Sequence, residues 1–290
     1  MLYLFTALYC EADIFIKYFH LKKNLENTRF QEFYQKKADI RLIVTGVGEI
    51  AAASAVSSVC SIYKPQEGDI LLNVGTCAHL AGKDGVFVCN KIIEMASGKT
   101  FYPDLLYCHG LPEETIVTAM LPCNRNGYAV EKGRTELSEI KGKGNLYDME
   151  AAAVYQSGTY FFGPHQMMFL KVVSDAGIAK EVSQETVRSC MEKNQDILFD
   201  FIEKISAITY KNQQRKEAFW LPELQLETLC VDLHCSRVME DSLRQHIRYW
   251  TLAGIDCISA IRDMYREGLL PCRDKREGKL RFEELKRRLF

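Results

Sequence analysis

Short apolar runs alternate with helical patterns along the first two hundred residues. Runs of strand length occupy residues 2–8, 40–46, 69–75, 85–93, 114–121 and 167–177. Helical patterns cover 11–21, 49–63 and 150–161, and a long amphipathic helix is expected over 183–205, with Ser183 as its N-cap. The third strand is expected to end at the turn-like stretch GTCAHL. This alternation predicts an α/β layer sandwich.

The pattern changes after residue 210, and the chain divides there into two parts. Residues 1–210 form the α/β domain, the polar stretch 211–225 with Pro222 reads as a linker, and 226–290 form a mainly helical module. Helices are expected over 236–254 and 255–270, each ending near a glycine or proline.

The extreme C-terminus is basic and raises a second interpretation of this module. Eight Lys or Arg stand against four Asp or Glu over 273–290, and GKLRF (278–282) could form the wing strand of a winged-helix-like unit. Over 213–290 the charges nearly balance, 15 against 13. A solvated face therefore explains the basic end better than nucleic-acid binding.

Composition excludes several classes of protein. The 290 residues carry a net charge of −1, with 47% hydrophobic and 26% charged residues, values typical of soluble globular domains. No run reaches the ~18 apolar residues of a membrane helix, and no signal-peptide pattern begins the chain. The eleven cysteines include no CxxC pair, so we expect reduced thiols in a cytoplasmic protein, with a Cys230–His234–Cys235 metal site a weak alternative.

Polar and glycine-bearing motifs stand where predicted strands end. Glu11 follows the first strand, TGVGE (45–49) the second, NVGTCAHL (73–80) the third and VSDAG (173–177) a late one. The carboxyl ends of strands are where open α/β sheets place ligands. Glycine turns let backbone N–H groups approach a ligand, and a desolvated carboxylate can act as an acid or base.

A further motif, YDMEAAAVY (147–155), places Asp148 and Glu150 directly before a small-residue helix. A carboxylate taken out of water needs a partner or a use. Helix-terminal charge alone could explain Glu150, helix capping could explain Asp148, and a strand-end cap could explain Asp175.

Together these motifs resemble one family, the purine nucleoside phosphorylase and nucleosidase superfamily, and within it the methylthioadenosine/S-adenosylhomocysteine nucleosidases. ALYCEAD is similar to the family's AMEEEV, VTGVGEIAAASA to SGIGKVAAA, LLNVGTCAHL to INTGSAGGL, YDMEAAAVY to VEMEATAIA, and VVSDAG to AISDVA. The resemblance covers roughly residues 1–210. It implies a three-layer sandwich around a mixed, twisted central sheet, no cofactor or metal, a small-molecule purine nucleoside as substrate, and a homodimer.

The resemblance also implies roles for single residues. Glu11 matches the carboxylate that activates the attacking water. Asp175 matches the acid that protonates or hydrogen-bonds purine N7, with Ser174 orienting it. The ribose would be held by Met149 and by Glu150, which accepts hydrogen bonds from the sugar hydroxyls, and would be lined by Thr76 and the backbone around Val47 and Gly75.

Hydrolysis is favoured over phosphorolysis, because phosphorolysis needs a bound phosphate dianion. Asn73 stands where the phosphorylases carry an arginine, and none of the five motifs contains an arginine. Cys77 and His79 replace small family residues, and 118–126 is only a distant counterpart of the family's base-stacking segment. A futalosine hydrolase, a 5′-deoxyadenosine nucleosidase, a phosphorylase and a non-catalytic nucleoside sensor or scaffold remain as alternatives.

Overall fold

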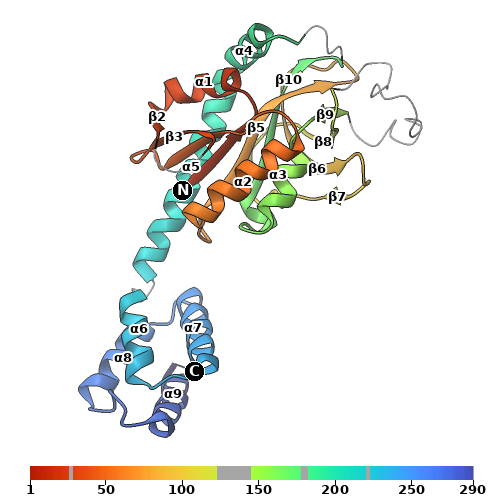
Figure 1. Cartoon of the computed structure of the whole chain (residues 1–290). Helices are drawn as coiled ribbons and strands as arrows, with labels where there is room; N and C mark the ends of the chain where they lie inside the picture. Colours follow the sequence, from red (N-terminus) through yellow and green to blue (C-terminus); the bar gives the residue numbers. More distant parts are fainter. Residues whose placement is uncertain (26–28, 123–144, 178–181, 220–222, 290) are drawn as a thin grey trace. The chain divides into compact units, whose positions relative to one another are not determined.

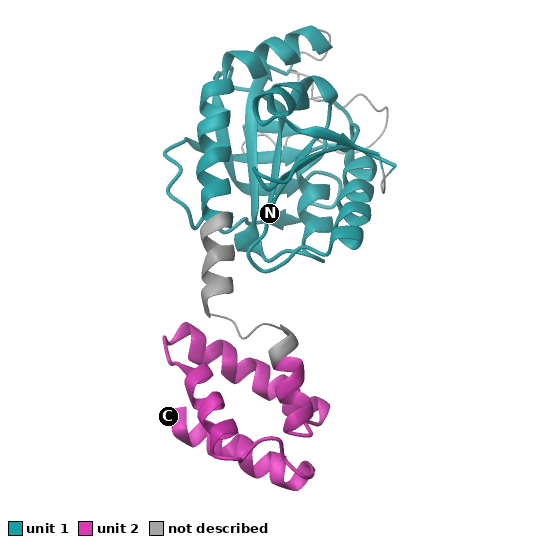
Figure 2. Cartoon of the chain, turned by 90° about the vertical axis from the view of Figure 1, so that its left-hand side faces the viewer, with its two compact units in different colours: residues 1–210 teal, residues 211–290 magenta. Residues whose placement is uncertain are grey.

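The computed structural model describes residues 1–25, 29–122, 145–177, 182–219 and 223–289, the side chains of 210–225 excepted. The chain forms two compact units, Met1–Tyr210 and Lys211–Phe290 (Figure 2). Each unit has a hydrophobic core of its own.

Unit 1 is built on a mixed ten-stranded sheet, in the order β10-β6-β8-β9-β5-β1-β4-β3-β2, with β7 paired to β6. The strands are β1 (Leu2–Thr6), β2 (Lys22–Asn24), β3 (Gln31–Gln35), β4 (Ile40–Val44), β5 (Ile70–His79), β6 (Val86–Glu94), β7 (Thr100–Phe101), β8 (Glu113–Thr118), β9 (Leu146–Asp148) and β10 (Met167–Asp175). The central strands β4, β1, β5 and β10 run parallel. Such strands are buried on both faces, and every residue of β1 is buried.

Five strands of this sheet close into a barrel. β5 pairs with β10 as well as with β9, so β5, β9, β8, β6 and β10 close on themselves. The end of β5 is therefore enclosed by partner strands, and it lies beside the ends of β9 and β10.

Helices cover both faces of the sheet, which gives the three layers (Figure 1). On one face α2 (Glu49–Tyr63) and α3 (Ala151–Gly158) pack on Tyr3 and Phe5 of β1. On the other, α1 (Tyr9–Tyr18), α4 (Gln184–Lys193) and α5 (Gln195–Phe219) pack on Leu2 and Leu4. Successive residues of a strand point to opposite faces, so one short strand supplies both cores. The predicted three-layer fold is confirmed.

Two sequence expectations about strands are wrong. β5 is not broken at GTCAHL but continues to His79, because β10 and β9 supply hydrogen-bond partners for these residues. Strands β2, β3 and β9 were not expected, since β2 and β9 have only three residues each and β3 carries no regular alternation.

The long helix expected over 183–205 is two helices. Ser183 caps α4 as predicted, its hydroxyl accepting a hydrogen bond from the Thr186 N–H at 3.1 Å. Asn194 separates α4 from α5: its side-chain amide donates to the Cys190 carbonyl at 2.9 Å. Asparagine competes with the helical backbone in this way, which favours a break.

Unit 2 is helical over its described residues. Besides the end of α5 it contains α6 (Glu223–Asp232), α7 (Arg237–Leu252), α8 (Cys257–Arg266) and α9 (Lys275–Leu289), packed around the fully buried Trp250. The wing strand expected over 278–282 is wrong, because these residues lie within α9. Most of the expected linker 211–225 is helical backbone, and 220–222 lie outside the described residues. In the described chain no helix is long and apolar enough to cross a membrane.

Candidate active site

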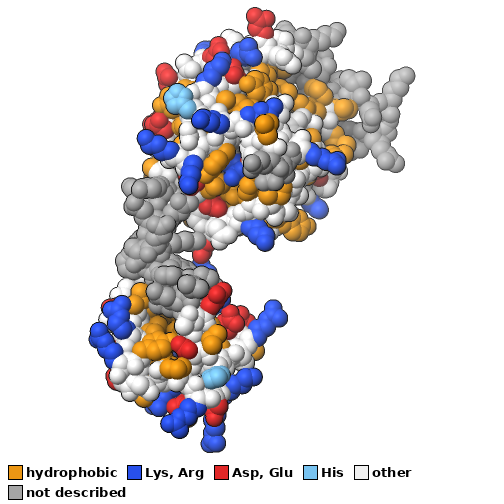
Figure 3. Space-filling model, turned by 60° about the vertical axis from the view of Figure 1, so that its left-hand side comes forward, with side chains coloured by type: hydrophobic (Ala, Val, Ile, Leu, Met, Phe, Trp, Pro, Cys, Tyr) orange, Lys and Arg blue, Asp and Glu red, His pale blue; other side chains and the backbone are white. Residues whose placement is uncertain are grey.

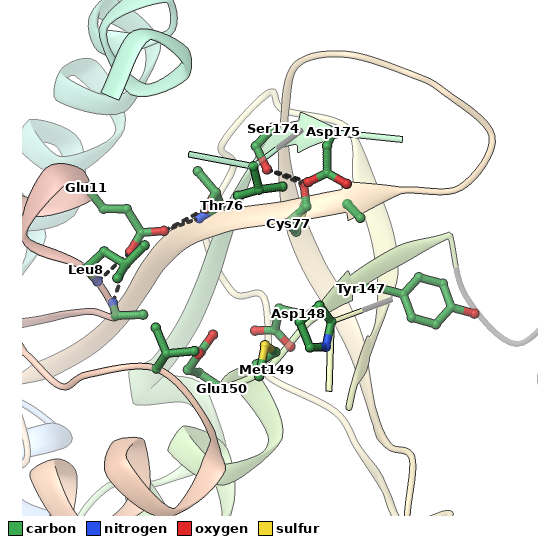
Figure 4. A pocket seen from close by; sticks show the side chains of 15 residues that line it. Leu8, Glu11, Thr76, Cys77, Tyr147, Asp148, Met149, Glu150, Ser174 and Asp175 are labelled. Carbon is green, nitrogen blue, oxygen red and sulfur yellow. Dashed lines mark hydrogen bonds between the residues drawn. The ribbon is translucent and has the colours of Figure 1, made fainter. Parts of the chain in front are cut away.

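A cavity of about 320 Å³ opens where β5, β9 and β10 end and α1 and α3 begin (Figure 4). It brings together residues from five motifs that lie far apart in the sequence. Of the residues predicted for the site, the cavity is lined by Glu11, Val47, Thr76, Met149, Glu150, Ser174 and Asp175.

Glu11 is held at the cavity wall by four hydrogen bonds. Its Oε1 accepts from the backbone N–H and the hydroxyl of Thr76, at 2.7 and 2.8 Å. Its Oε2 accepts from the N–H groups of Ala7 and Leu8, at 3.1 and 2.9 Å. The side chain has little freedom, and only 2% of the residue is exposed.

Gly75 does not line the cavity but explains how Glu11 fits there. A Cβ atom at position 75 would lie 3.3 Å from Glu11 Oε1, closer than ordinary van der Waals contact. The absence of a side chain lets the carboxylate lie against strand β5.

Glu150 lies across the cavity from Glu11 (Figure 4). It stands at the N-cap of α3, yet its side chain makes no capping hydrogen bond. Its Oε1 instead accepts the N–H of Gly48 at 2.8 Å. Gly48 has φ 97°, a conformation that favours glycine and that here begins α2.

The environment of Glu150 disfavours its charged form. Burial and then the nearby charge of Asp148 raise the pKa of Glu150 to about 7, against the opposing effects of Lys171 and the Gly48 N–H. A carboxyl that titrates near neutral pH in a cleft is a feature of functional sites.

Asp148 is buried, and both of its carboxylate oxygens contact hydrogen-bond or ion-pair partners. Its Oδ2 accepts the Ala151 N–H at 2.8 Å, which caps α3 as one sequence interpretation expected. The same oxygen lies 2.8 Å from Nζ of Lys171, and Oδ1 accepts the Thr118 hydroxyl at 2.7 Å. Burial lowers the pKa of Lys171, but Asp148 and Glu150 raise it more, and the net shift is upward.

Asp175 ends β10 at the far side of the cavity. Its Oδ2 lies 2.8 Å from the Ser174 hydroxyl, and its Oδ1 accepts the Gly177 N–H at 2.7 Å. The Ser174 hydroxyl also lies 3.3 Å from the carbonyl oxygen of Cys77. The carboxyl is thus oriented by its neighbours and closes a strand-end turn at the same time.

Sequence reasoning missed Lys171, the cation nearest these acids. Its signal was a lysine inside the apolar run MMFLKVV, since a buried lysine needs an acidic partner. Of the two residues that depart from the family turn, Cys77 lines the cavity. His79 is buried against Phe87 and accepts the Ala81 N–H at 3.1 Å, so it acts locally. Of the base-stacking counterpart 118–126, residues 123–126 lie outside the described residues.

Three basic side chains at the end of unit 2 form ion pairs with acids of the same unit. Arg288 contacts Glu267 and Glu284 at 2.6 and 2.8 Å, and Arg281 contacts Glu284 at 2.8 Å. Figure 3 shows acidic and basic side chains interspersed on this unit. In the described chain no group of three or more His, Cys, Asp or Glu residues is placed to hold a metal ion.

The fold is similar to solved nucleosidase structures. A Helicobacter pylori 5′-methylthioadenosine/S-adenosylhomocysteine nucleosidase matches at 13% identity, over 70% of this chain and 97% of its own, with a TM-score of 0.56. An Arabidopsis thaliana 5′-methylthioadenosine nucleosidase matches at 17% identity over 70% and 95%, with a TM-score of 0.57. A futalosine hydrolase mutant of Helicobacter pylori matches at 12% identity over 70% and 98%, with a TM-score of 0.55. No protein-family model and no curated protein matches the chain.

These similarities establish the fold and no more, because a likeness at such low identity leaves the reaction open. The share of the chain that they cover corresponds in size to unit 1. Both nucleosidases and a futalosine hydrolase have this fold, so the substrate must be argued from the cavity itself.

Proposed function

We propose that unit 1 is a purine nucleosidase, which hydrolyses the N-glycosidic bond of an adenosine-type nucleoside such as methylthioadenosine, S-adenosylhomocysteine or 5′-deoxyadenosine. The observation that carries this proposal is the cavity in which Glu11, Glu150 and Asp175 meet from three different motifs. The three acids have different partners. Glu11 accepts hydrogen bonds from backbone N–H groups and from Thr76, and Glu150 accepts one from Gly48 beside buried charged groups. Asp175 is held by Ser174 and Gly177.

Each acid has a task in this reaction. Glu11 takes a proton from water as the water oxygen attacks C1′ of the ribose. The C1′–N9 bond breaks with its electrons passing to the base, and Asp175 is the general acid that gives a proton to purine N7. The products are the free sugar and the free base.

Glu150 serves the sugar instead of the base. As a carboxylate it accepts hydrogen bonds from the two ribose hydroxyls, with Met149 against the ring. Its negative charge also stabilises the positive charge that grows on the ribose as the bond breaks.

The cavity supports hydrolysis over phosphorolysis. Its described lining contains no lysine or arginine that could hold a phosphate dianion. The nearby Lys171 is ion-paired with Asp148. Asn73, which stands where phosphorylases carry an arginine, is buried and donates to the Phe5 carbonyl at 3.1 Å.

We also propose that the protein acts as a homodimer. Ile50 and Tyr160 are 79% and 84% exposed and line one groove on the α2–α3 face of unit 1. Val47, which is half exposed, lines the cavity and comes just before α2 in the sequence. Large apolar side chains gathered on one face are typical of an interface.

The experiment that tests the nucleosidase is an assay of adenine release from the three nucleosides, with and without phosphate. We expect phosphate-independent release, and a loss of roughly 10²-fold or more in rate for Asp175→Asn. Asp200→Asn, an exposed acid on α5 far along the chain from the cavity motifs, is the matched control and should retain the full rate. Failure of the wild-type protein to cleave any of the three would remove the proposal, and strict dependence on phosphate would make it a phosphorylase.

A further inference from the structure

Lys171 is a buried cation in the middle of strand β10. Its neighbours across the sheet are Gly75 on β5 and Phe87 on β6, and its side chain is 1% exposed. Burying an ammonium group is costly unless a well-placed anion compensates it. Asp148, with its side chain fully buried, provides that anion at 2.8 Å.

This ion pair is tied to the start of helix α3 by further hydrogen bonds. Asp148 accepts the Ala151 N–H at 2.8 Å, and Thr118 on β8 both donates to Asp148 and accepts the Ala152 N–H at 2.9 Å. The first turn of α3 is therefore fastened to β8, β9 and β10 together. Glu150 occupies the N-cap of this helix, so its backbone is held by the same network.

The ion pair also sets the charge around Glu150. The groups that face Glu150 come from four elements: Asp148 on β9, Lys171 on β10, Glu11 on α1 and the Gly48 N–H at the start of α2. Lys171 is the one cation among these four groups. Without it, three carboxylates would share a largely dehydrated space.

We propose that Lys171 is a positioning residue for Glu150: through its ion pair with Asp148 it fixes the first turn of α3, and its positive charge offsets the acids beside Glu150, so that Glu150 can accept hydrogen bonds from two sugar hydroxyls. The part of this proposal that concerns the sugar rests on the proposed nucleosidase function. The part that concerns the charge of Glu150 does not.

The two members of the ion pair should have opposite effects on Glu150. Lys171→Met removes the cation and leaves two adjacent acids, so protons are bound more tightly. Asp148→Asn removes one acid and leaves the cation beside Glu150, while an asparagine oxygen can still accept the Ala151 N–H. A purely structural role would disturb α3 in both variants without opposite shifts in titration.

The test is a ¹³C NMR titration of the full-length protein labelled at the Asp and Glu carboxyl carbons, with Glu150→Gln to assign the Glu150 signal. We expect Lys171→Met to raise the apparent pKa of the Asp148–Glu150 pair and Asp148→Asn to lower that of Glu150, each by about 1 pH unit or more. Lys171→Arg, which keeps the charge, should return the titration toward that of the wild type. Lys204→Met, an exposed lysine paired with Asp200, is the control and should leave it unchanged.

Shifts of the same sign in the two variants, or no shift in Asp148→Asn, would overturn the proposal. Should Lys171→Met fail to fold, as judged by circular dichroism, Asp148→Asn decides, because Glu150 remains as an anion near Lys171 and the asparagine oxygen can still cap α3.

Adenine release as a function of pH separates this inference from the proposed function. If the nucleosidase is active, the acid limb of kcat/KM should move in the same direction as the NMR titration in each variant. If the two variants shift the carboxyl titrations in opposite directions but the protein cleaves no nucleoside, the role of Lys171 is supported and the nucleosidase proposal is contradicted.

Discussion

At the scale of single residues, the acids of the cavity differ in what surrounds them. Glu11 is surrounded by four donors, whereas Glu150 has one backbone donor and an acidic neighbour. Two acids in different environments can play different parts in one reaction. The sequence motif alone presents both as glutamates, so this difference appears only in the folded protein.

The raised pKa of Glu150 predicts that this residue costs stability. Its pKa is about 7 in the folded protein against an ordinary 4.5, so the folded state binds the proton more tightly. Protonation thus favours folding, and the contribution of Glu150 to stability is lost as pH rises from about 4.5 through 7. Between pH 4.5 and pH 8, the free energy of unfolding of Glu150→Gln should therefore rise relative to that of the wild type by on the order of 2–3 kcal/mol. The variant should lose activity.

Urea unfolding at pH 5 and pH 8 checks this prediction. The advantage of Glu150→Gln should be larger at pH 8, and the same comparison for the exposed Glu192→Gln should show no such change. An advantage that is equal at both pH values would show that Glu150 titrates normally.

At the scale of elements, pairing decides structures that local sequence leaves ambiguous. The stretch GTCAHL reads as a turn, yet Thr76 and Cys77 pair with Val172 and Val173 of β10. This extension of β5 carries Thr76 to Glu11 and Cys77 to the cavity. Strand propensity depends on such neighbours, which a local pattern does not contain.

The contact between α9 and Leu233, the residue that follows α6, is close enough to predict a damaging substitution. A Cβ atom at Gly278 would lie 1.8 Å from the backbone carbonyl oxygen of Leu233, and a backbone atom cannot move aside as a side chain can. Gly278→Ala should therefore destabilise unit 2 by about 2 kcal/mol or more. Ordinarily alanine would stabilise a helix relative to glycine, so the sign of the effect reports the packing.

Hydrogen exchange followed by mass spectrometry measures this effect locally. Peptides from α7 and α9 should exchange faster in Gly278→Ala, and peptides from β1 and β5 should not change. Leu280→Ala, at an exposed position of the same helix, is the control. Unchanged protection of α7 and α9 would show that Gly278 does not pack closely against the Leu233 backbone.

At the scale of the whole molecule, the chain combines a nucleosidase-like α/β unit with a helical unit that has a hydrophobic core of its own. The described residues that line the cavity all belong to unit 1.

The proposed homodimer makes a prediction at this scale. Ile50→Lys replaces an exposed apolar side chain of the α2–α3 groove with a charge, so it should convert a dimer to a monomer in light scattering coupled to gel filtration. Leu252→Lys, at an equally exposed position in unit 2, should leave the dimer intact. A wild-type protein that is monomeric at micromolar concentration would contradict the proposal.

The sequence by itself determined the layers and the position of the division, because hydrophobic periodicity and composition are local properties of the chain. It also identified Glu11, Glu150 and Asp175 as candidate site residues from their places beside predicted strands and helices, and the family resemblance added Thr76 and Ser174. Only the tertiary structure decided that β5 runs on to His79, that Lys171 pairs with Asp148, and that Glu150 is not used as a cap. The physical reason is common to all three: each depends on what other strands and helices bring alongside from distant parts of the chain.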